Sequence, residues 1–336
     1  MKLGAIGEFG MIERIRALFP VPEGCVGIGD DCAVIDQPGD RVLLVTTDLL
    51  VEDVHFLRDR ITPEELGHKA LAVNLSDIAA MGGKATAAFL SIGLPRDTEV
   101  AWIDGFFAGL GALSRATGCA LLGGDTTGSP RGVVINIAVL GEAERGRVVY
   151  RSGARPGDVL AVTGLLGDSG AGLRLLLEGG VVAGDADERY LVDAHHRPVP
   201  HLAEGAWLAA TGAVRAMMDV SDGIESDVRH ILASSRVGAR IEVDRLPVSD
   251  AMRRVAGSKG WDVGELAATA GEDYVLLCAV DPARFDVVAE LFAARFGRPL
   301  RAIGRIEAES GLRLEEGGRP VAWRRHGFDH FNRSGA

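Results

Sequence analysis

Short apolar runs and amphipathic stretches alternate along the first half of the chain. Residues Arg41 to Thr46 form a run of leucine and β-branched side chains, which predicts a buried strand that ends at the polar pair Thr47-Asp48. Further predicted elements in this half are strands at residues 87–94, 120–122 and 133–140, and a helix at residues 97–117. We therefore expect an α+β arrangement here.

One helix can be placed from its end signals. Residues Thr62 to Glu65 supply an N-cap, a proline at the first helical position and the glutamate of a capping box, so a helix should run from there through Ala80. Asp77 follows Leu66 and Val73 at helical spacing, which places a carboxylate on the apolar face. A carboxylate that faces inward needs a bonding partner.

A polar stretch with glycine and proline, residues 151–158, separates the second half of the chain. Other predicted elements follow it: strands at residues 159–163, 239–243 and 274–280, and helices at residues 169–177, 201–211 and 285–296. We expect two domains, residues 1–150 and residues 151–336.

Composition narrows the class of protein. The 336-residue chain is 47% hydrophobic and 25% charged, as in an ordinary globular protein. Its formal net charge of -11 disfavours a nucleic-acid partner, because such binding needs clustered lysine and arginine. There is no apolar run of about 18 residues and no signal-peptide core, so we expect no membrane association and a cytoplasmic location. The four cysteines form no C-x-x-C pair, which argues against a zinc site or a disulfide framework.

Five acidic motifs are the most informative feature of the chain, and we expect each at a turn beside an apolar or helical segment. They are Gly29–Cys32, Thr46–Asp48, Asn74–Asp77, Gly123–Thr127 and Asp219–Gly223. Two carboxylates about 6 Å apart repel by roughly 2–3 kcal/mol at an effective dielectric constant of about 20. If the motifs converge in space, they therefore require bound cations.

A single aspartate beside glycine or serine is most often a turn former or a helix N-cap. Five such motifs together favour a shared metal site instead. Mg²⁺ takes oxygen ligands, usually one or two carboxylates with waters and substrate phosphates, and several ions need several carboxylates. The candidate ligands from this reasoning are Asp31, Asp48, Asp77, Asp125, Asp219 and Asp222.

Two other patterns carry less weight. Residues 164–172 form a glycine-rich turn before a helix, but they lack the G-x-x-x-x-G-K-[ST] arrangement, and the chain has no H-R-D catalytic loop. A packing role at the helix entry is favoured. His195, His196 and His201 have prolines among them, which favours a loop that orders the domain over a metal site.

Several segments resemble the thiamine-monophosphate kinase family, which belongs to the aminoimidazole ribonucleotide synthetase-like superfamily of ATP-using enzymes. The segments occur in the family's order and are Gly27–Ala33, Thr46–Asp48 with His55-Phe56, Lys69–Gly82, Gly123–Thr127, Asp219–Gly223 and Gly271–Tyr274. The resemblance extends from Gly7–Phe9 to Phe328–Phe331, nearly the whole chain.

This resemblance implies an α/β (α+β) fold of two domains, each a mixed sheet with packed helices. It implies that residues 1–150 bind ATP and Mg²⁺ and form a homodimer, and that residues 151–336 complete the nucleotide and substrate site. The implied activity is the ATP-dependent phosphorylation of thiamine monophosphate to thiamine diphosphate, with several Mg²⁺ ions around the phosphates.

The family's functional residues carry over to matching positions of this chain. Metal ligation carries over to Asp31, Thr46, Thr47, Asp48, Asp77, Asp125, Asp219 and Asp222. ATP contacts carry over to Phe107, Gly124, Asp125, Arg151 and Ser221, and substrate contacts to His55, Glu272 and Phe328. Phe107 stands where the family often has tyrosine, so only stacking on the adenine can remain there.

The chemistry can also be argued without the family. An acceptor phosphate monoester has a second pKa of about 6, so its oxygen is mostly ionised at pH 7 and no general base is required. His55 is therefore assigned a hydrogen bond to the substrate, with a surface or capping role as the alternative. The permanent charge of thiazolium favours a carboxylate such as Glu272 and an aromatic face, for which Phe328 competes with Trp323.

Two other functions remain open from the sequence. One is a cyclase or ligase of the aminoimidazole ribonucleotide synthetase type, in which ATP activates an amide or carbonyl oxygen. The other is a metal- and nucleotide-binding module without catalytic activity. Product analysis with ATP, Mg²⁺ and thiamine monophosphate distinguishes the three.

Overall fold

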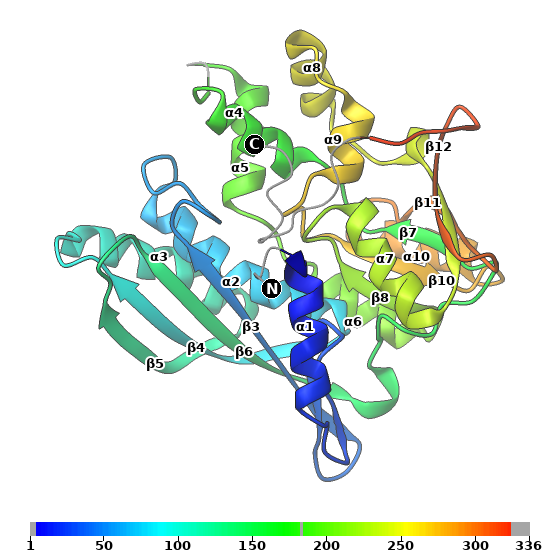
Figure 1. Ribbon diagram of the computed structural model, residues 1–336, viewed down its shortest axis with the longest axis horizontal. Coiled ribbons are helices and arrows are strands. Elements are labelled where there is room, and N and C mark those ends of the chain that lie inside the picture. Colours follow the sequence, from blue (N-terminus) through cyan, green and yellow to red (C-terminus); the bar gives the residue numbers. More distant parts are fainter. Residues whose placement is uncertain (1–4, 182–183, 324–336) are drawn as a thin grey trace.

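The computed structural model describes residues 5–181 and 184–323 and contains two β-sheets (Figure 1). The first sheet has the strand order β1-β2-β3-β6-β4-β5. Its strands are β1 (Cys25–Val26), β2 (Ala33–Asp36), β3 (Arg41–Val51), β4 (Lys84–Leu94), β5 (Ala120–Gly128) and β6 (Val134–Glu144). Neighbouring strands are antiparallel except β4 and β5, which are parallel, so the sheet is mixed.

Helices cover one face of this sheet. α2 (Pro63–Ala80) packs against α3 (Val100–Thr117) and against strands β3 and β6, while α1 (Gly7–Leu18) precedes the sheet in the chain (Figure 1). Buried side chains of α2 such as Leu71 and Leu75 join those of the strands in one core. The sheet and its two helices form the first layer pair of the molecule.

The second sheet has the order β13-β12-β9-β11-β7-β10-β8, with β9 and β12 parallel and the other neighbours antiparallel. Its strands are β7 (Val159–Val162), β8 (Val214–Asp219), β9 (Gly238–Glu242), β10 (Leu276–Val280), β11 (Arg301–Glu307), β12 (Gly311–Glu316) and β13 (Arg319–Pro320). The described residues also include the short 3₁₀ helices Arg145–Arg147 and Val243–Arg245.

Helices lie on both faces of the second sheet. They are α4 (Asp168–Leu177), α5 (Ala186–His196), α6 (Leu202–Thr211), α7 (Ile224–Ser235), α8 (Asp250–Lys259), α9 (Val263–Thr269) and α10 (Phe285–Phe296). Successive residues of β10 alternate between the two cores: Leu277 packs with α4, α5 and α7–α9, whereas Cys278 packs with α6 and α10.

The two halves of the chain share part of their cores. The end of α2, at Ala79 and Ala80, packs in the cluster that contains Leu208 of α6 and Phe292 of α10. In the other direction, Tyr274 from the segment before β10 packs in the core of the first sheet. Helix α2 therefore lies where the two halves meet, and its side chains can reach residues of both.

Much of the predicted architecture is confirmed. The fold class is α/β (α+β), with two mixed sheets and packed helices. The helix predicted from Thr62 to Ala80 is present, and both hydrogen bonds of the capping box between Thr62 and Glu65 form. The helix predicted at residues 285–296 has those bounds.

Among the strands that are longer than predicted, two change the setting of a motif. β3 continues to Val51 because all of it pairs with β6, so Thr47 and Asp48 lie inside the strand and not at its end. β5 continues to Gly128 alongside β4, so Asp125 also lies in a strand and not at a turn. The prediction that all five motifs sit at turns is therefore wrong for these two.

The predicted histidine loop is also wrong. His195 and His196 end the helix α5, and His201 is the N-cap of α6. Asp185 starts α5 by accepting hydrogen bonds from the backbone N–H groups of Asp187 and Glu188. This cap signal is present in the sequence. The helix that follows mixes charged and apolar residues, so its apolar face could not be recognised from the sequence.

Two expectations about the side chains and the helices can be checked directly. The four cysteines are free thiols, three of them buried and Cys25 half-buried. Among the helices of the described residues, none combines the length and the apolar character needed to cross a membrane.

Candidate active site

Three aspartates from distant parts of the sequence meet between the two halves of the chain. Carboxylate oxygens of Asp31, Asp77 and Asp219 lie within 4.8 Å of one another, and we call these residues the aspartate cluster. Asp31 lies in the turn between β1 and β2, Asp77 in the last turn of α2, and Asp219 at the end of β8. Two unit negative charges at this separation repel by roughly 3 kcal/mol at an effective dielectric constant of about 20.

Hydrogen bonds satisfy only part of the cluster. The hydroxyl of Thr46 donates to Asp77, and that of Ser76 donates to Asp219. The Nε of Arg151 donates to Oδ1 of Asp31 over 3.2 Å. The other oxygen of Asp31, Oδ2, is buried and has no hydrogen-bond partner among the described residues. A buried carboxylate oxygen without a donor is the kind of ligand that a metal ion satisfies.

The surroundings of these carboxylates disfavour their charged form. Burial raises the pKa of Asp219 to about 7, and the negative charge of Asp31 adds to this effect. Burial, followed by repulsion from Asp48, Asp219 and Asp31, raises the pKa of Asp77 well above its usual range. A cation bound among the carboxylates would reverse these shifts, because it favours the charged form.

Asp48 borders the cluster from β3. Burial raises the pKa of its carboxyl to about 6. Its backbone N–H donates to Oδ1 of Asn74 over 3.0 Å, which ties β3 to α2. Because side chains alternate along a strand, Thr46 and Asp48 face α2 while Thr47 faces away, and Thr47 accepts a hydrogen bond from Asn136 over 2.8 Å. The side chain of Thr47 is therefore apart from the other two.

Arg151 is fixed at the cluster by two neighbouring aspartates. The backbone N–H of Arg151 donates to Asp30 over 2.9 Å, while its guanidinium group pairs with Asp31. Burial raises the pKa of Asp30 to about 6. The predicted ATP contact Arg151 thus supplies the positive charge nearest to Asp31.

The loop after β8 carries Ser221 and Asp222. The backbone N–H of Asp222 donates to Oδ2 of Asp227 over 3.2 Å, and Asp227 is 1% exposed. Burial, with repulsion from Asp222 and Asp219, raises the pKa of Asp227 well above its usual range. The carbonyl oxygen of Ser221 accepts from the backbone N–H of Glu272 over 2.7 Å, so this loop also touches a predicted substrate contact.

Glu272 is held by groups from both halves of the chain. Its Oε2 lies 3.1 Å from Nζ of Lys69 on α2 and 3.1 Å from Nδ1 of His195 on α5. The backbone of Glu272 has a φ of 64°, a conformation that costs free energy for a residue other than glycine. Strain of this kind is typical of functional sites.

The remaining predicted ATP contacts lie on the edge strand β5 and on helix α3. Gly124 and Asp125 are exposed on β5, which β4 and β6 separate from β3. A side chain at Gly124 would place its Cβ 1.7 Å from the carbonyl oxygen of Leu90, so only glycine fits. Phe107 of α3 is 39% exposed and contacts Phe106 edge to face. The structure does not bring these residues into the aspartate cluster.

The other two predicted substrate contacts are His55 and Phe328. His55 lies in the turn after β3, and its Nδ1 accepts from the backbone N–H of Val51 over 3.0 Å. In the neutral ring this leaves Nε2 as the N–H donor. Phe328 lies outside the described residues, and its rival Trp323 is half-buried against the core of the second sheet.

Sequence reasoning missed several residues that position the site. They are Asp30, Lys69, Asn74, Ser76, Asp227 and His195. For Lys69 and Ser76 a signal existed, because both lie in the segment Lys69–Gly82, one of the segments that resemble the family. For Asp227 and His195 no local pattern could indicate the partner.

The glycine-rich turn at α4 does not form an open anion site. The carboxylate of Asp273 accepts from the backbone N–H groups of Gly167 and Ser169 over 2.6 and 3.4 Å, and so occupies the helix N-terminus. A Cβ at Gly172 would lie 2.1 Å from the carbonyl oxygen of Leu191. The turn therefore serves close packing, as the sequence favoured.

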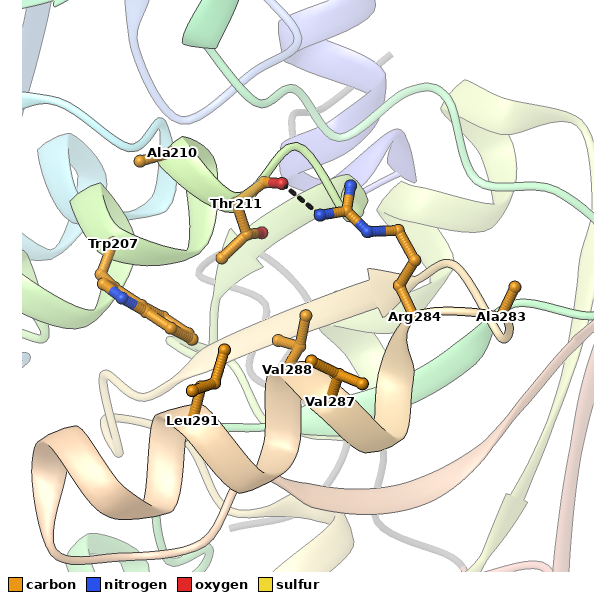
Figure 2. A pocket seen from close by; sticks show the side chains of 8 residues that line it. All are labelled: Trp207, Ala210, Thr211, Ala283, Arg284, Val287, Val288 and Leu291. Atoms are coloured by element: carbon orange, nitrogen blue, oxygen red, sulfur yellow. Dashed lines mark hydrogen bonds between the residues drawn. The ribbon is translucent and has the colours of Figure 1, made fainter.

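An apolar groove between α6 and α10 lies apart from this chemistry (Figure 2). Trp207, Val288 and Leu291 line it, and Arg284 at its edge donates to the carbonyl oxygen of Thr211 over 2.8 Å. None of the predicted site residues in the described part of the chain lines this groove. The aspartate cluster, and not this groove, is therefore the candidate active site.

Comparison with known proteins first defines a class. Residues 29–143 match the family described as AIR synthase related protein, N-terminal domain, and residues 155–316 match its C-terminal domain. The chain is thus a two-domain protein of the AIR synthase related class. The expected two-domain fold is confirmed.

Individual relatives narrow the class. The chain is 40% identical to a thiamine-monophosphate kinase from Salmonella typhimurium over 97% of this chain and 99% of that protein. It is 35% identical to a thiamine-monophosphate kinase from Bacillus subtilis over 91% and 93%. A solved structure described as AaThiL complexed with AMPPCP and TMP has a TM-score of 0.86 and 34% identity, over 98% and 99%. The chain belongs to the thiamine-monophosphate kinase family and is a phosphotransferase.

Proposed function

We propose that this chain transfers the γ-phosphoryl group of ATP directly, and in the presence of Mg²⁺, to thiamine monophosphate, which yields thiamine diphosphate. The observation that carries the proposal is the aspartate cluster, which gathers carboxylates from both halves of the chain around the unpartnered oxygen of Asp31. The names of the relatives and the molecules in the AaThiL complex support the choice of substrates.

The residues present fit Mg²⁺. Carboxylate and hydroxyl oxygens are the ligands that this ion prefers. Oδ2 of Asp31 has no hydrogen-bond donor among the described residues, so it is available to an ion. We assign the ions to Asp31, Thr46, Asp48, Asp77, Asp219 and Asp222. We also propose Thr47 and Asp125 as ligands, although their side chains lie apart from the aspartate cluster in this structure. When bound, Mg²⁺ neutralises the charge that builds up between two phosphorylated molecules.

The protein itself supplies position and charge for an in-line transfer. Arg151 offers a planar guanidinium group that can bind phosphate oxygens in a bidentate manner, and we assign it to ATP. The further ATP contacts in this proposal are Phe107, Gly124, Asp125 and Ser221. Because the acceptor oxygen is already ionised at pH 7, no side chain needs to remove a proton from it.

Helix α2 sets the distance between the two ends of the acceptor site. Lys69, which contacts Glu272, precedes Asp77 by eight residues, a rise of about 12 Å along the helix axis. An elongated acceptor can therefore place its phosphate at the aspartate cluster and its positive ring near Glu272. We assign His55, Glu272 and Phe328 to thiamine monophosphate.

We also propose a domain boundary, a homodimer and a location for this chain. A domain boundary near residue 150 is supported by the end of β6 at Glu144 and the start of β7 at Val159. Among the described residues, helices cover one face of the first sheet, and the opposite face exposes Leu49 and Phe89, so we propose that a second copy covers it (Figure 1). A mass of one chain by light scattering would exclude this homodimer. We expect the enzyme to act in the cytoplasm.

Product analysis tests the proposed function. The purified protein is incubated with ATP, Mg²⁺ and thiamine monophosphate, and the products are separated by chromatography. Thiamine diphosphate and ADP should form in equal amounts, and chelation of Mg²⁺ should stop the reaction. ADP formation with another acceptor but without thiamine diphosphate would favour a cyclase or ligase, and the absence of ADP with every acceptor would indicate a binding module.

A further inference from the structure

The side chain of Lys69 is fully buried, with 0% of it exposed. Burying an ammonium group is costly unless it is paired and hydrogen-bonded. Its Nζ donates to Glu272 over 3.1 Å, and it lies 3.5 Å from Nε2 of His195. Lys69 belongs to the first half of the chain, and both of its partners belong to the second.

The protons of this network can be assigned from chemistry. Lysine is only a donor, so Nε2 of His195 must accept, and the proton of the neutral ring is then on Nδ1. Nδ1 is 3.1 Å from the hydroxyl of Ser169 and 3.1 Å from Oε2 of Glu272. Burial, with repulsion from Lys69, lowers the pKa of His195 well below its usual range. The network therefore contains one cation, one anion and a neutral histidine.

The contacts hold one end of the Glu272 carboxylate and leave the other available. Lys69 and His195 both approach Oε2, and the described residues offer no hydrogen bond to Oε1. The side chain of Glu272 is 25% exposed. Its backbone N–H is bonded to Ser221, which fixes the strained segment from the other side.

We propose that Lys69 is a positioning residue for the acceptor: by holding Oε2, it fixes Glu272 so that Oε1 meets the positive ring of thiamine monophosphate. This inference builds on the proposed function and adds a residue that the motif match did not assign. Lys69 acts on the acceptor through Glu272, so its loss should weaken acceptor binding and leave ATP binding intact.

A double-mutant cycle with Lys69→Met and Glu272→Gln tests the inference. Each single variant should raise the KM for thiamine monophosphate at least about tenfold, the size expected for a lost hydrogen bond to a charged group. The KM for ATP should change less than twofold. The KM of the double variant for thiamine monophosphate should be no higher than that of the more impaired single variant, because both changes disrupt one contact.

A matched control is available in Lys259. Its Nζ pairs with the buried Glu188 over 3.2 Å, its own side chain is 29% exposed, and neither residue is among the predicted site residues. Lys259→Met should leave the KM for thiamine monophosphate unchanged. If Lys69→Met does not fold alone, the double variant, which buries no unpaired charge, is compared with Glu272→Gln instead, and an equal KM supports the inference.

The outcomes separate the two proposals. An active wild-type enzyme whose KM for thiamine monophosphate is unaffected by Lys69→Met would overturn the role of Lys69 alone. Independent effects that multiply in the double variant would do the same, as would a further rise in KM of the double variant over Glu272→Gln. A wild-type enzyme that forms no thiamine diphosphate would overturn the proposed function, and the role of Lys69 with it.

Discussion

Asp31 shows at the scale of one residue how folding and ligand binding are coupled. Its carboxylate is buried, one oxygen is paired with Arg151, and the other has no donor among the described residues. Such a group destabilises the metal-free protein, because a buried charge without full compensation is costly. A metal ion that binds the folded chain and not the unfolded chain should offset this cost and raise the melting temperature.

The variant Asp77→Asn separates binding from folding. The amide oxygen can still accept from Thr46, but one negative charge leaves the cluster, so the melting temperature of the metal-free protein should not fall. Turnover should drop at least about a hundredfold, as expected when an electrostatic contribution of several kcal/mol is lost. The rise in melting temperature with Mg²⁺ and nucleotide should shrink, as differential scanning fluorimetry can measure.

The control for this variant is Asp59→Asn. Asp59 is a surface carboxylate whose side chain is 76% exposed and which pairs with Arg60. Its replacement should leave both turnover and the Mg²⁺-induced rise unchanged. Full activity of Asp77→Asn would contradict the assignment of the cluster to the reaction.

At the scale of secondary structure, the sequence predicts elements whose signals are local. Helix α2 was placed because Thr62, Pro63 and Glu65 carry a complete start signal. The length of β3 could not be predicted, because its last residues are held by pairing with β6 and not by their own polarity. The setting of Asp48 inside a strand therefore required the structure.

One contact between elements should make stability depend on pH. Nδ1 of His201, the N-cap of α6, shares a hydrogen bond of 2.6 Å with the hydroxyl of Thr163, and that hydroxyl accepts from the backbone N–H of Leu276. Burial, with repulsion from Arg298, lowers the pKa of His201 to about 3. Below about pH 6.5 the unfolded chain binds a proton that the folded chain excludes, so stability falls as the pH drops.

The variant His201→Gln measures this effect. Between pH 7.5 and pH 5, the wild-type protein should lose about 2 kcal/mol more of unfolding free energy than the variant. Urea unfolding at the two pH values provides the comparison. The same pH dependence in both proteins would show that His201 is not the group responsible.

At the scale of the whole molecule, the site exists only because the two halves meet. Ser76 bonds to Asp219 across 143 positions of the chain, and Lys69 bonds to Glu272 across 203. The motifs indicated that aspartates would gather, since five acidic motifs together favour a shared metal site over separate turn formers. Which of them gather, and which side chains hold them, depends on tertiary packing that no local pattern encodes.

The motif of Asp125 illustrates this limit. By sequence it resembles the other four motifs, yet it lies on the exposed strand β5, which the two strands β6 and β4 separate from β3. Its own Oδ1 accepts from the backbone N–H of Thr126 over 2.9 Å. A role for Asp125 with the nucleotide therefore remains a proposal that depends on the bound molecules.

Crystals grown with Mn²⁺ and AMPPCP would test the central claim most directly, because Mn²⁺ takes the same kind of oxygen ligands as Mg²⁺ and scatters anomalously. We predict anomalous peaks between the carboxylates of Asp31, Asp77 and Asp219, next to the phosphates of the nucleotide. Nucleotide bound at the cluster with no peak among these three side chains, or peaks confined to other parts of the surface, would contradict the account.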